Sequence, residues 1–406
     1  MRILQISCSD AGGGAERIAL DLHREYLRQG HESMLLVCNK HSSIPDVSGL
    51  ANGNALSWKI ANLLLRKIAY YTGIQTGFKY LFDRWFKQNQ IAWDVIHCHN
   101  LHGGYFPIEY LRTLSKISPV VITLHDEWLY TGHCAYTLGC ERWLEGCGHC
   151  PRLQTYPPVL FDNTAATLTK RVTLLKELNP TLVSPSKWLA ERVKRSKLNM
   201  FCNVISNGID LDKFINIPKT IARTNLGFSQ GLKLLLFVAN GGLSNVYKDG
   251  TTMLEALRIV ESHFNKAEVK LIVVGGGGGV PSDLGSSIIE AGKINQEEIN
   301  QYYCAADILV YPTKADNFPL VLIEAMVCGT PIVVSDIGGC SEIVVNGKTG
   351  YVVEPDNARL IAVRIINVLK EDHTEMVQTG MKWAKSNFSL GKMTQNYLDL
   401  YHTITE

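Results

Sequence analysis

The stretch KADNFPLVLIEAMVCGTPIVVSD (residues 314–336) carries a loop, a helix and a strand in quick succession. Pro319 can begin a helix, because the first helical turn needs no amide donor there. Gly329 and Pro331 follow the expected helix end, and both residue types stop helices. The apolar run IVVS (332–335) comes next, and the run DILVYPT (307–313) precedes the segment. A helix between two such runs predicts a β–α–β unit with parallel strands.

The same alternation extends over both halves of the chain. Nearly continuous apolar runs are typical of strands buried on both faces of a parallel sheet. In the first half we expect an amphipathic helix over 15–30 and strands at 2–7, 33–38, 94–99, 119–124, 181–186 and 203–207. In the second half we expect a helix near 251–264 and strands at 233–240, 269–279, 307–313, 332–335 and 350–355. The sequence therefore predicts an α/β protein with two doubly wound, Rossmann-like domains.

The length of the chain also indicates two domains, because 406 residues exceed one ordinary hydrophobic core. The apolar periodicity lapses between Asn207 and Phe214. We therefore expect an N-terminal domain over 1–209 and a C-terminal domain over 210–382. The last segment, 383–406, has a helical pattern and is expected to cross back to the N-terminal domain.

The composition is typical of a folded protein that neither binds nucleic acid nor spans a membrane. A hydrophobic fraction of 46% with 19% charged residues is typical of a folded chain. A net charge of +2 argues against nucleic acid as a partner, since such proteins carry clustered basic excess. The start MRILQISCSD lacks the long apolar core of an export signal, and no run is long enough to cross a bilayer. We therefore expect a cytoplasmic protein.

Two glycine-rich loops follow expected strands. Gly12, Gly13 and Gly14 join the first strand to the first helix, where backbone can approach an anionic ligand closely. Arg17 breaks the dinucleotide pattern G-x-G-x-x-G, so a close-approach loop at a ligand cleft is the favoured interpretation, with Gly13 and Gly14 as candidate contacts. The run Gly275–Gly279 is either a turn or a ligand contact, and the sequence leaves both open.

Asp316 and Glu324 are the acidic residues of the opening stretch. The amides of Asn317, Phe318 and the following residues enter a helix, whose first amides lack intrahelical acceptors and carry positive potential. Farther along, the carboxylate of Glu324 can accept hydrogen bonds from a ribose diol. An isolated pair of acids at this spacing is normally solvated surface, but the flanking residues make this pair more specific.

The stretch resembles the signature of the retaining glycosyltransferases of the GT-B fold: an acid, seven residues, a Glu, then A-M-x-x-G-x-P-V-V. The segments SPSKWLAERV (184–193) and SNGIDLDKF (206–214) also match. The resemblance covers nearly the whole chain. It implies two Rossmann-like domains facing each other across a cleft, and a nucleotide-sugar donor carrying UDP or GDP.

By this resemblance Glu324 would bind the donor ribose, and Asp316 with the amides of Asn317 and Phe318 would hold the donor sugar. Lys248 would neutralise the diphosphate and the leaving group. The family usually has a Glu where Asp316 stands. It usually has an Arg where Asn240 stands, and no Arg occurs between residues 224 and 257. An amide cannot replace the charge of a guanidinium, so Lys248, together with Lys314, would carry the phosphate contact.

His125 and Asp126 follow the expected strand at 119–124, at a carboxyl end where ligand-binding residues gather in parallel sheets. A His there is often a hydrogen-bonded core residue. The resemblance implies instead that His125 contacts the donor sugar. It also implies front-face transfer with retention and without a catalytic metal, in which positioning and charge stabilisation do the work.

HCHNLHGG (97–104) adds three more histidines, for which polar lining of an acceptor site is favoured over metal binding. The segment 58–87 contains six basic residues, one acid and many aromatic residues. It is either a core helix whose charges face water or an interfacial segment on an anionic leaflet. The second interpretation suits a polyprenyl-linked acceptor and a peripheral position on the inner face of the membrane. A soluble small-molecule acceptor and a non-catalytic, sugar-nucleotide-binding assembly partner are the alternative functions.

The segment TGHCAYTLGCERWLEGCGHCP (131–151) contains Cys134, Cys140, Cys147 and Cys150. Their spacing is C-x5-C-x6-C-x2-C, and its last pair fits a zinc knuckle. A structural zinc site, reduced thiols and disulfides all remain open. The segment resembles a subgroup of exopolysaccharide glycosyltransferases of the colanic-acid or capsule type. With four thiolate ligands a metal here would have no open position, so its role would be to hold the loop beside His125.

Overall fold

A computed structural model describes residues 1–50, 56–72, 79–295 and 297–406. The chain divides into two compact units. Unit 1 comprises Met1–Ser206 and Met393–Glu406, and unit 2 comprises Asn207–Lys392. Each unit is a parallel sheet covered by helices on both faces, so the α/β prediction is confirmed.

The sheet of unit 1 has seven strands within the described residues, in the order β3-β2-β1-β4-β5-β6-β7, and all neighbours pair in parallel. The strands are β1 (Arg2–Ser9), β2 (Glu32–Asn39), β3 (Val47–Gly49), β4 (Val95–His99), β5 (Val120–Thr123), β6 (Thr181–Ser184) and β7 (Cys202–Val204). Only β3 was not expected, because its residues VSG form no apolar run.

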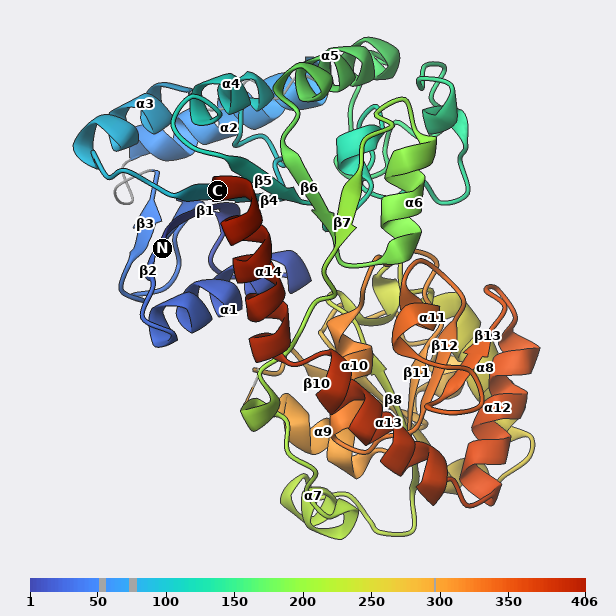
Figure 1. Ribbon diagram of the computed structural model, residues 1–406. Coiled ribbons are helices and arrows are strands. Elements are labelled where there is room, and N and C mark those ends of the chain that lie inside the picture. Colours follow the sequence, from blue (N-terminus) through green and yellow to red (C-terminus); the bar gives the residue numbers. More distant parts are fainter. Residues whose placement is uncertain (51–55, 73–78, 296) are drawn as a thin grey trace. The chain divides into compact units, whose positions relative to one another are not determined.

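Helices cover both faces of this sheet. The helices are α1 (Gly14–Arg28), α2 (Leu56–Thr72), α3 (Lys79–Gln88), α4 (Leu111–Leu114), α5 (Thr164–Leu178), α6 (Lys187–Arg195) and α14 (Leu390–Thr405). In Figure 1, α2 to α5 lie on one side of the sheet, and α1 and α14 lie on the other. The larger core lies on the α2–α5 side. It is built from one face of the strands and from aromatic and aliphatic residues such as Phe82, Trp85 and Leu175.

The sheet of unit 2 has six described strands in the order β10-β9-β8-β11-β12-β13, again all parallel. The strands are β8 (Lys233–Val238), β9 (Val269–Val274), β10 (Ile288–Gly292), β11 (Ile308–Tyr311), β12 (Ile332–Ser335) and β13 (Tyr351–Val353). The helices are α7 (Lys219–Asn225), α8 (Gly250–Glu261), α9 (Ile299–Ala305), α10 (Leu320–Val327), α11 (Cys340–Ile343), α12 (Ala358–Lys370) and α13 (Thr374–Asn387).

The strand order reverses once in each sheet, between β1 and β4 in unit 1 and between β8 and β11 in unit 2. At such a switch point the loops leaving neighbouring strands run to opposite faces, which opens a crevice at their carboxyl ends. The loops after these four strands are therefore the places to search for ligand-binding residues.

The C-terminal segment is two helices rather than one. α13 packs on α10 in unit 2, whereas α14 belongs to unit 1 from Met393 onward. The sequence placed the boundaries after residues 209 and 382; the structure divides the chain after Ser206 and Lys392. The two helices share an apolar period, so the pattern could not show which of them packs on which sheet.

Candidate functional site

In unit 2, the loops after β8 and β11 bring Lys248 and Asp316 together. The ammonium of Lys248 forms an ion pair with the carboxylate of Asp316 and donates to the carbonyl of Ala315 at 3.3 Å. The hydroxyl of Tyr311, the last residue of β11, donates to the same carboxylate at 2.7 Å. Both charged side chains are about five-sixths buried, with 15% and 16% exposed. The switch point of this sheet thus holds one cation and one anion that a polar ligand can engage.

Glu324 lies one helix turn inside α10 and is almost fully buried. The hydroxyl of Tyr303, from α9, donates to its Oε2 at 2.6 Å. A carboxylate held in this way has its orientation fixed by packing and one strong hydrogen bond. The sequence indicated Glu324 but gave no signal for Tyr303, because the two residues meet only when α9 packs on α10.

Lys314 was expected to support Lys248 at the phosphate. Its ammonium forms ion pairs with Asp249 at 3.1 Å and Asp356 at 3.0 Å, and a contact with phosphate stays a prediction. Burial acts to lower the pKa of Lys314, but the hydrogen bonds to Asp356 and Asp249 outweigh it, so the pKa lies above its ordinary value. Lys314 therefore clamps the start of α8 to the loop after β13.

The glycine run after β9 forms a loop with a defined backbone conformation. All five residues of Gly275–Gly279 have positive φ. A Cβ on Gly275 or Gly277 would collide with the backbone carbonyl of Ala239 or Gly241, in the loop after β8. The two loops can approach so closely only because these positions lack side chains. The neighbouring Asn240 accepts a hydrogen bond through its carbonyl from Asn245 at 2.8 Å.

Asn317 and Phe318 stand just before α10, whose N-cap is Pro319. The carbonyl of Asn317 accepts the amide of Gly339 at 2.9 Å, and the Phe318 ring packs edge-on against Phe388 at 5.6 Å. These contacts fix the backbone of the loop, so any ligand contact of Phe318 would be made by its main chain.

In unit 1, His125 is the end of a buried chain of polar groups. Its Nε2 lies 3.0 Å from Nδ1 of His99, and Nε2 of His99 lies 3.1 Å from Oε1 of Gln5. Burial lowers the pKa of His125 to about 4, with Asp126 opposing and His102 adding to the shift. Burial also holds the pKa of His99 well below its ordinary value, with His97 and His125 adding to the effect. Both rings are therefore neutral near pH 7.

The side chains of His97 and His99 are fully buried, so the expectation that they line an acceptor site is wrong. The Nε2 atom of His97 forms a hydrogen bond of 2.7 Å with the hydroxyl of Thr123, and its Nδ1 atom forms one of 2.7 Å with the hydroxyl of Tyr401. In a parallel strand buried on both faces, alternate side chains point into the helix layers rather than to the strand end.

The carboxylate of Asp126 forms hydrogen bonds with two residues of neighbouring loops. One carboxylate oxygen accepts the amide of Trp128 at 2.9 Å, and the other lies 2.6 Å from Nε2 of His102. The His102 ring in turn lies against Trp128 and Tyr156, with ring centroids 5.6 Å apart in both cases. Asp126 thus holds in place the aromatic residues that follow it.

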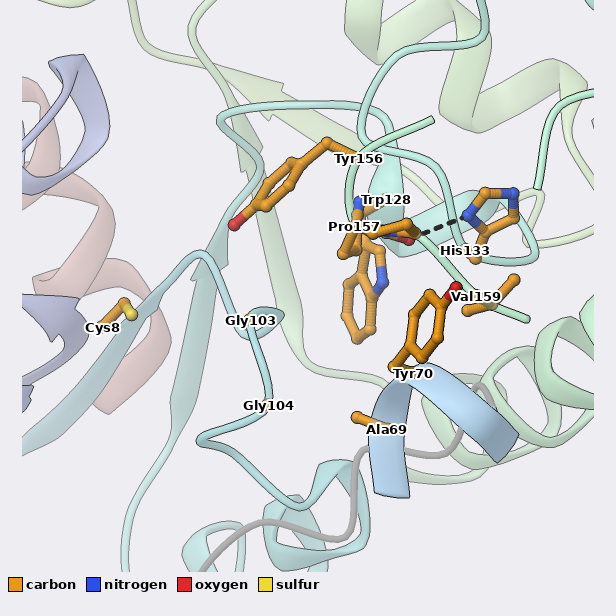
Figure 2. Close-up of a pocket in the computed structure, with 11 residues that line it drawn as sticks. Cys8, Ala69, Tyr70, Gly103, Gly104, Trp128, His133, Tyr156, Pro157 and Val159 are labelled. Atoms are coloured by element: carbon orange, nitrogen blue, oxygen red, sulfur yellow. Dashed lines mark hydrogen bonds between the residues drawn. The ribbon is translucent and has the colours of Figure 1, made fainter. Parts of the chain in front are cut away.

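Those aromatic residues line a cavity of about 240 Å³, shown in Figure 2. Its walls come from the carboxyl ends of β1, β4 and β5, from the end of α2, and from residues 156–159. They are Cys8, Ala69, Tyr70, Gly103, Gly104, Trp128, His133, Tyr156, Pro157, Pro158 and Val159. The cavity lies at the switch point of this sheet and presents three aromatic rings. The sequence did not indicate it, because its lining residues run from Cys8 to Val159, about three-quarters of the N-terminal domain.

Gly13 and Gly14 begin α1 beside the same switch point. The amide of Gly13 donates to the carboxylate of Glu16 at 3.0 Å, which caps the helix. The preceding Asp10 accepts the amides of His41 and Ser42 at 2.8 and 2.9 Å. The loop is therefore tied to the neighbouring strand β2, while its role in donor binding stays a prediction.

The four cysteines of the loop after β5, together with His133, line one small cavity of about 20 Å³. All eleven cysteines lie in the described part of the chain, and no disulfide joins any of them there. Among the described residues, no three or more His, Cys, Asp or Glu side chains are placed to hold a metal ion. The zinc interpretation therefore rests on the sequence spacing and stays a prediction.

His133 connects this loop to the aromatic cavity. Its Nδ1 lies 3.0 Å from the carbonyl of Pro157, and its Nε2 lies 3.4 Å from Sγ of Cys150. A carbonyl only accepts, so Nδ1 donates to it and Nε2 accepts from the thiol. On the other side, the buried Arg171 donates to the carbonyls of Trp128 and Thr131 at 2.5 and 2.7 Å. The cysteine loop is thus part of the wall of the cavity.

No helix in the described ranges is both long and apolar enough to cross a membrane.

Known proteins resemble the chain over its full length. Residues 12–213 match the family model of glycosyltransferase family 4, and residues 233–371 match that of glycosyl transferases group 1. The putative colanic acid biosynthesis glycosyl transferase WcaC of Escherichia coli K12 is 24% identical over 418 residues, covering 100% of both chains. A D-inositol 3-phosphate glycosyltransferase of Thermobispora bispora is 32% identical over 183 residues, 41% of this chain and 42% of the relative.

Two solved structures share the fold. Sucrose-phosphate synthase from Thermosynechococcus elongatus superposes with a TM-score of 0.70 at 18% identity, covering 99% of this chain and 98% of that one. Anabaena Alr3699/HepE in complex with UDP-glucose superposes with a TM-score of 0.68 at 17% identity, covering 99% and 100%. With both halves matched by glycosyltransferase models on two Rossmann-like units, the chain belongs to the GT-B glycosyltransferases.

Proposed function

We propose that the protein transfers a sugar from a UDP- or GDP-sugar to a lipid-linked or oligosaccharide acceptor in polysaccharide biosynthesis, with retention of anomeric configuration. The observation that carries the proposal is the ion pair of Lys248 with Asp316 after β8 and β11, together with Glu324 on the helix that follows β11, each oriented by a hydrogen bond or ion pair. The full-length similarity to a colanic acid glycosyltransferase and the UDP-glucose bound to Anabaena Alr3699/HepE support it.

On the donor side, Glu324 accepts hydrogen bonds from the ribose hydroxyls, and Tyr303 keeps its carboxylate in place. Asp316, with the amides of Asn317 and Phe318, binds hydroxyls of the sugar. The ammonium of Lys248 leaves its pairing with Asp316 to neutralise the diphosphate, and the main chain of Asn240 and of the glycine loops approaches the same phosphates.

In the reaction, the acceptor hydroxyl oxygen forms a bond to the anomeric carbon on the face from which the diphosphate leaves. The bond between that carbon and the diphosphate oxygen breaks, and a leaving phosphate oxygen takes the proton of the acceptor. Charge moves onto the diphosphate, so Lys248 contributes most in the transition state. His125, kept neutral by burial, donates or accepts a hydrogen bond to the donor sugar, and Asp126 positions the residues beside it.

The aromatic cavity of unit 1 is the proposed acceptor site. Sugar rings bury their apolar C–H faces against aromatic rings, and Tyr70, Trp128 and Tyr156 offer such surfaces around about 240 Å³. Trp128→Ala and Tyr156→Ala should raise the KM for acceptor and leave donor binding unchanged, because both side chains line the aromatic cavity and neither is among the proposed donor contacts.

The test is a panel of UDP-, GDP- and ADP-sugars with the full chain and a membrane lipid extract, scored by nucleotide release and by transfer of labelled sugar. One donor should be consumed in an acceptor-dependent manner. If no nucleotide is released and no labelled product forms with any donor, the transferase proposal is wrong. An α-configured linkage made from an α-configured donor establishes retention, and a β-configured linkage refutes it.

A soluble acceptor is the alternative that a specific observation favours. The relatives include D-inositol 3-phosphate glycosyltransferases, and sucrose-phosphate synthase shares the fold. Transfer to a sugar phosphate in the absence of lipid would select this alternative.

A further inference from the structure

Helix α2 turns large apolar side chains to the outside of unit 1. Its exposed described positions, apart from Lys67, are Ile60, Leu63, Leu64, Ile68 and Tyr71. Between 43% and 57% of each of these five residues is exposed. Their spacing of i, i+3, i+4, i+8 and i+11 places them in one stripe along the helix.

The opposite side of α2 faces the protein. Ala69 is 8% exposed, and Leu65 packs against the core of unit 1. A surface helix ordinarily turns its apolar stripe inward and its polar residues outward. α2 is apolar on both sides, so packing within unit 1 does not account for the outer stripe.

The stripe continues onto the neighbouring loop. The amide of Leu160 donates to the carbonyl of Tyr70 at 2.7 Å, which places Leu160 and Phe161 beside the end of α2. These two residues are 37% and 60% exposed. We call the five stripe residues together with Leu160 and Phe161 the α2 apolar surface. Contiguous exposed apolar surfaces of this kind are typical of interaction sites.

Within the described residues, the exposed charged side chains of α2 and of α3, the next helix along the chain, are all basic. Lys67 lies within the stripe, and α3 exposes Lys79, Arg84 and Lys87. Two acids lie nearby, and both are engaged. The carboxylate of Asp83 accepts the hydroxyl of Tyr110 at 3.0 Å, and that of Asp162 accepts the amides of Cys150 and Thr164. An apolar stripe with basic residues around it is complementary to the interface of an anionic bilayer.

α2 also forms part of the aromatic cavity. Ala69 and Tyr70, near its end, line the cavity, and in Figure 2 the Tyr70 ring lies beside Trp128 and Val159. One helix therefore joins the exposed apolar surface to the proposed acceptor site.

We propose that the α2 apolar surface docks in the interface of an anionic lipid bilayer, with α2 lying along the membrane plane. The apolar side chains enter the region between headgroups and acyl chains, and the basic residues contact lipid phosphates. Docking holds the aromatic cavity at the height of the headgroups, where the sugar of a lipid-linked acceptor stands; this last step rests on the proposed function.

The test is flotation of the full chain with vesicles of phosphatidylcholine containing about 30% phosphatidylglycerol, without donor or acceptor. Leu64→Glu/Ile68→Glu should reduce the bound fraction at least about tenfold, because two buried charges oppose insertion. Ile221→Glu/Val363→Glu is the matched control. It adds the same two charges at positions 51% and 42% exposed on α7 and α12, and should bind like the wild type.

A second arm tests the charge. Each of Lys67→Gln and Lys87→Gln should weaken binding to the anionic vesicles about fivefold, and pure phosphatidylcholine should bind the wild type weakly. The proposal is overturned if the wild type binds neither vesicle, or if the control double variant loses binding as strongly as Leu64→Glu/Ile68→Glu. It is also overturned if light scattering shows a wild-type dimer that this variant converts to a monomer without any vesicle binding.

The experiments distinguish failure of the docking proposal from failure of the proposed function. Transfer to a water-soluble acceptor without vesicles should be unchanged in Leu64→Glu/Ile68→Glu. If the wild type does not bind vesicles but still transfers sugar, docking alone is refuted. Vesicle binding without turnover of any nucleotide sugar would refute the proposed function alone.

Discussion

Two tyrosines orient the two carboxylates of the proposed donor site. Tyr303 donates to Glu324 and Tyr311 donates to Asp316, in each case from a neighbouring element of unit 2. The acids were indicated by their spacing in one short stretch, whereas the tyrosines come from separate positions and carry no motif. At this scale the sequence predicts which groups do the chemistry, and packing supplies the groups that orient them.

Glu324→Gln should raise the Kd for the nucleotide-sugar donor about 10- to 100-fold. The amide keeps an oxygen for Tyr303 but loses the charge that strengthens hydrogen bonds to ribose hydroxyls. Calorimetric titration with the preferred donor measures the effect. Glu255→Gln, which removes one charge from an exposed position on α8, should bind donor normally. Equal Kd values for wild type and Glu324→Gln would contradict the assignment.

The buried histidines of unit 1 should make stability fall as the pH drops. Burial lowers the pKa of His125 to about 4, and the unfolded chain protonates the same ring near pH 6.5. Between these values the unfolded state binds more protons, so stability rises with pH and is lost as pH falls from 6.5 toward 4. His125 alone should cost on the order of 2 kcal/mol at pH 5 relative to pH 7.5.

Chemical unfolding at pH 7.5 and pH 5 tests this effect. His125→Asn should show a smaller difference between the two pH values than the wild type, since Asn does not titrate. His402→Asn, at an exposed position of α14, should keep the wild-type difference. An unchanged difference in His125→Asn would mean that the ring is already protonated in the folded protein near pH 6. In turnover, His125→Ala should lower kcat more than it weakens donor binding.

Among the elements, strands with an apolar run were predictable, including the edge strands β7 and β13, whereas the edge strands β3 and β10 were not. β12 has the bounds that the run IVVS predicted. β10 was missed because its residues IIEAG are partly exposed at the edge of the sheet and form no apolar run. The glycine run after β9 could be a turn or a ligand contact from the sequence. The structure shows that it packs against the loop after β8, which is a contact between backbones that no local pattern reveals.

Gly277→Ala should destabilise the protein by more than about 1 kcal/mol and weaken donor binding. The residue has a φ of +103°, and its Cβ would collide with the backbone of Gly241, so both loops must shift. Thermal unfolding and donor titration measure the two effects. Gly285→Ala is the control, because its φ of −54° suits alanine and the nearest atom to its Cβ is 3.6 Å away. Equal melting temperatures of the two variants would show that the loop adapts freely.

The cysteine loop after β5 carries a separate prediction. If its spacing reports a structural zinc site, protein purified without chelator should contain about one zinc per chain. Cys147→Ser/Cys150→Ser should then lose the metal and also raise the KM for acceptor, since the loop holds the cavity wall through His133. Cys202→Ser, at a buried cysteine outside the loop, is the control. Less than about 0.2 zinc per chain would leave the four residues as plain thiols.

For the whole molecule, the C-terminal helix α14 completes unit 1. Tyr397 and Tyr401 are fully buried there. The hydroxyl of Tyr397 lies 2.9 Å from Thr123, and that of Tyr401 lies 2.7 Å from Nδ1 of His97 and 3.0 Å from the hydroxyl of Tyr26. These contacts tie the last residues of the chain to strands β4 and β5 and to α1, so unit 1 is formed from both ends of the chain.

Tyr401→Phe should lower the free energy of unfolding by about 1–3 kcal/mol, because it leaves two buried polar groups without this partner. Tyr26→Phe removes only one of the two hydrogen bonds and should cost less. Urea unfolding of both variants, followed by tryptophan fluorescence, gives the comparison. Equal stability of Tyr401→Phe and wild type would show that the buried network contributes nothing to unit 1.

The sequence by itself determined the alternation of strands and helices, the division into two units and the acids Asp316 and Glu324, because these depend on local periodicity and spacing. Tertiary structure alone decided the histidine network of unit 1, the walls of the aromatic cavity and the partners of Lys314. It also decided which side of α2 is exposed: a helix that is apolar on both sides does not indicate which side meets the core. Leu65 packs against the core and Ala69 is buried, whereas the stripe from Ile60 to Tyr71 is exposed.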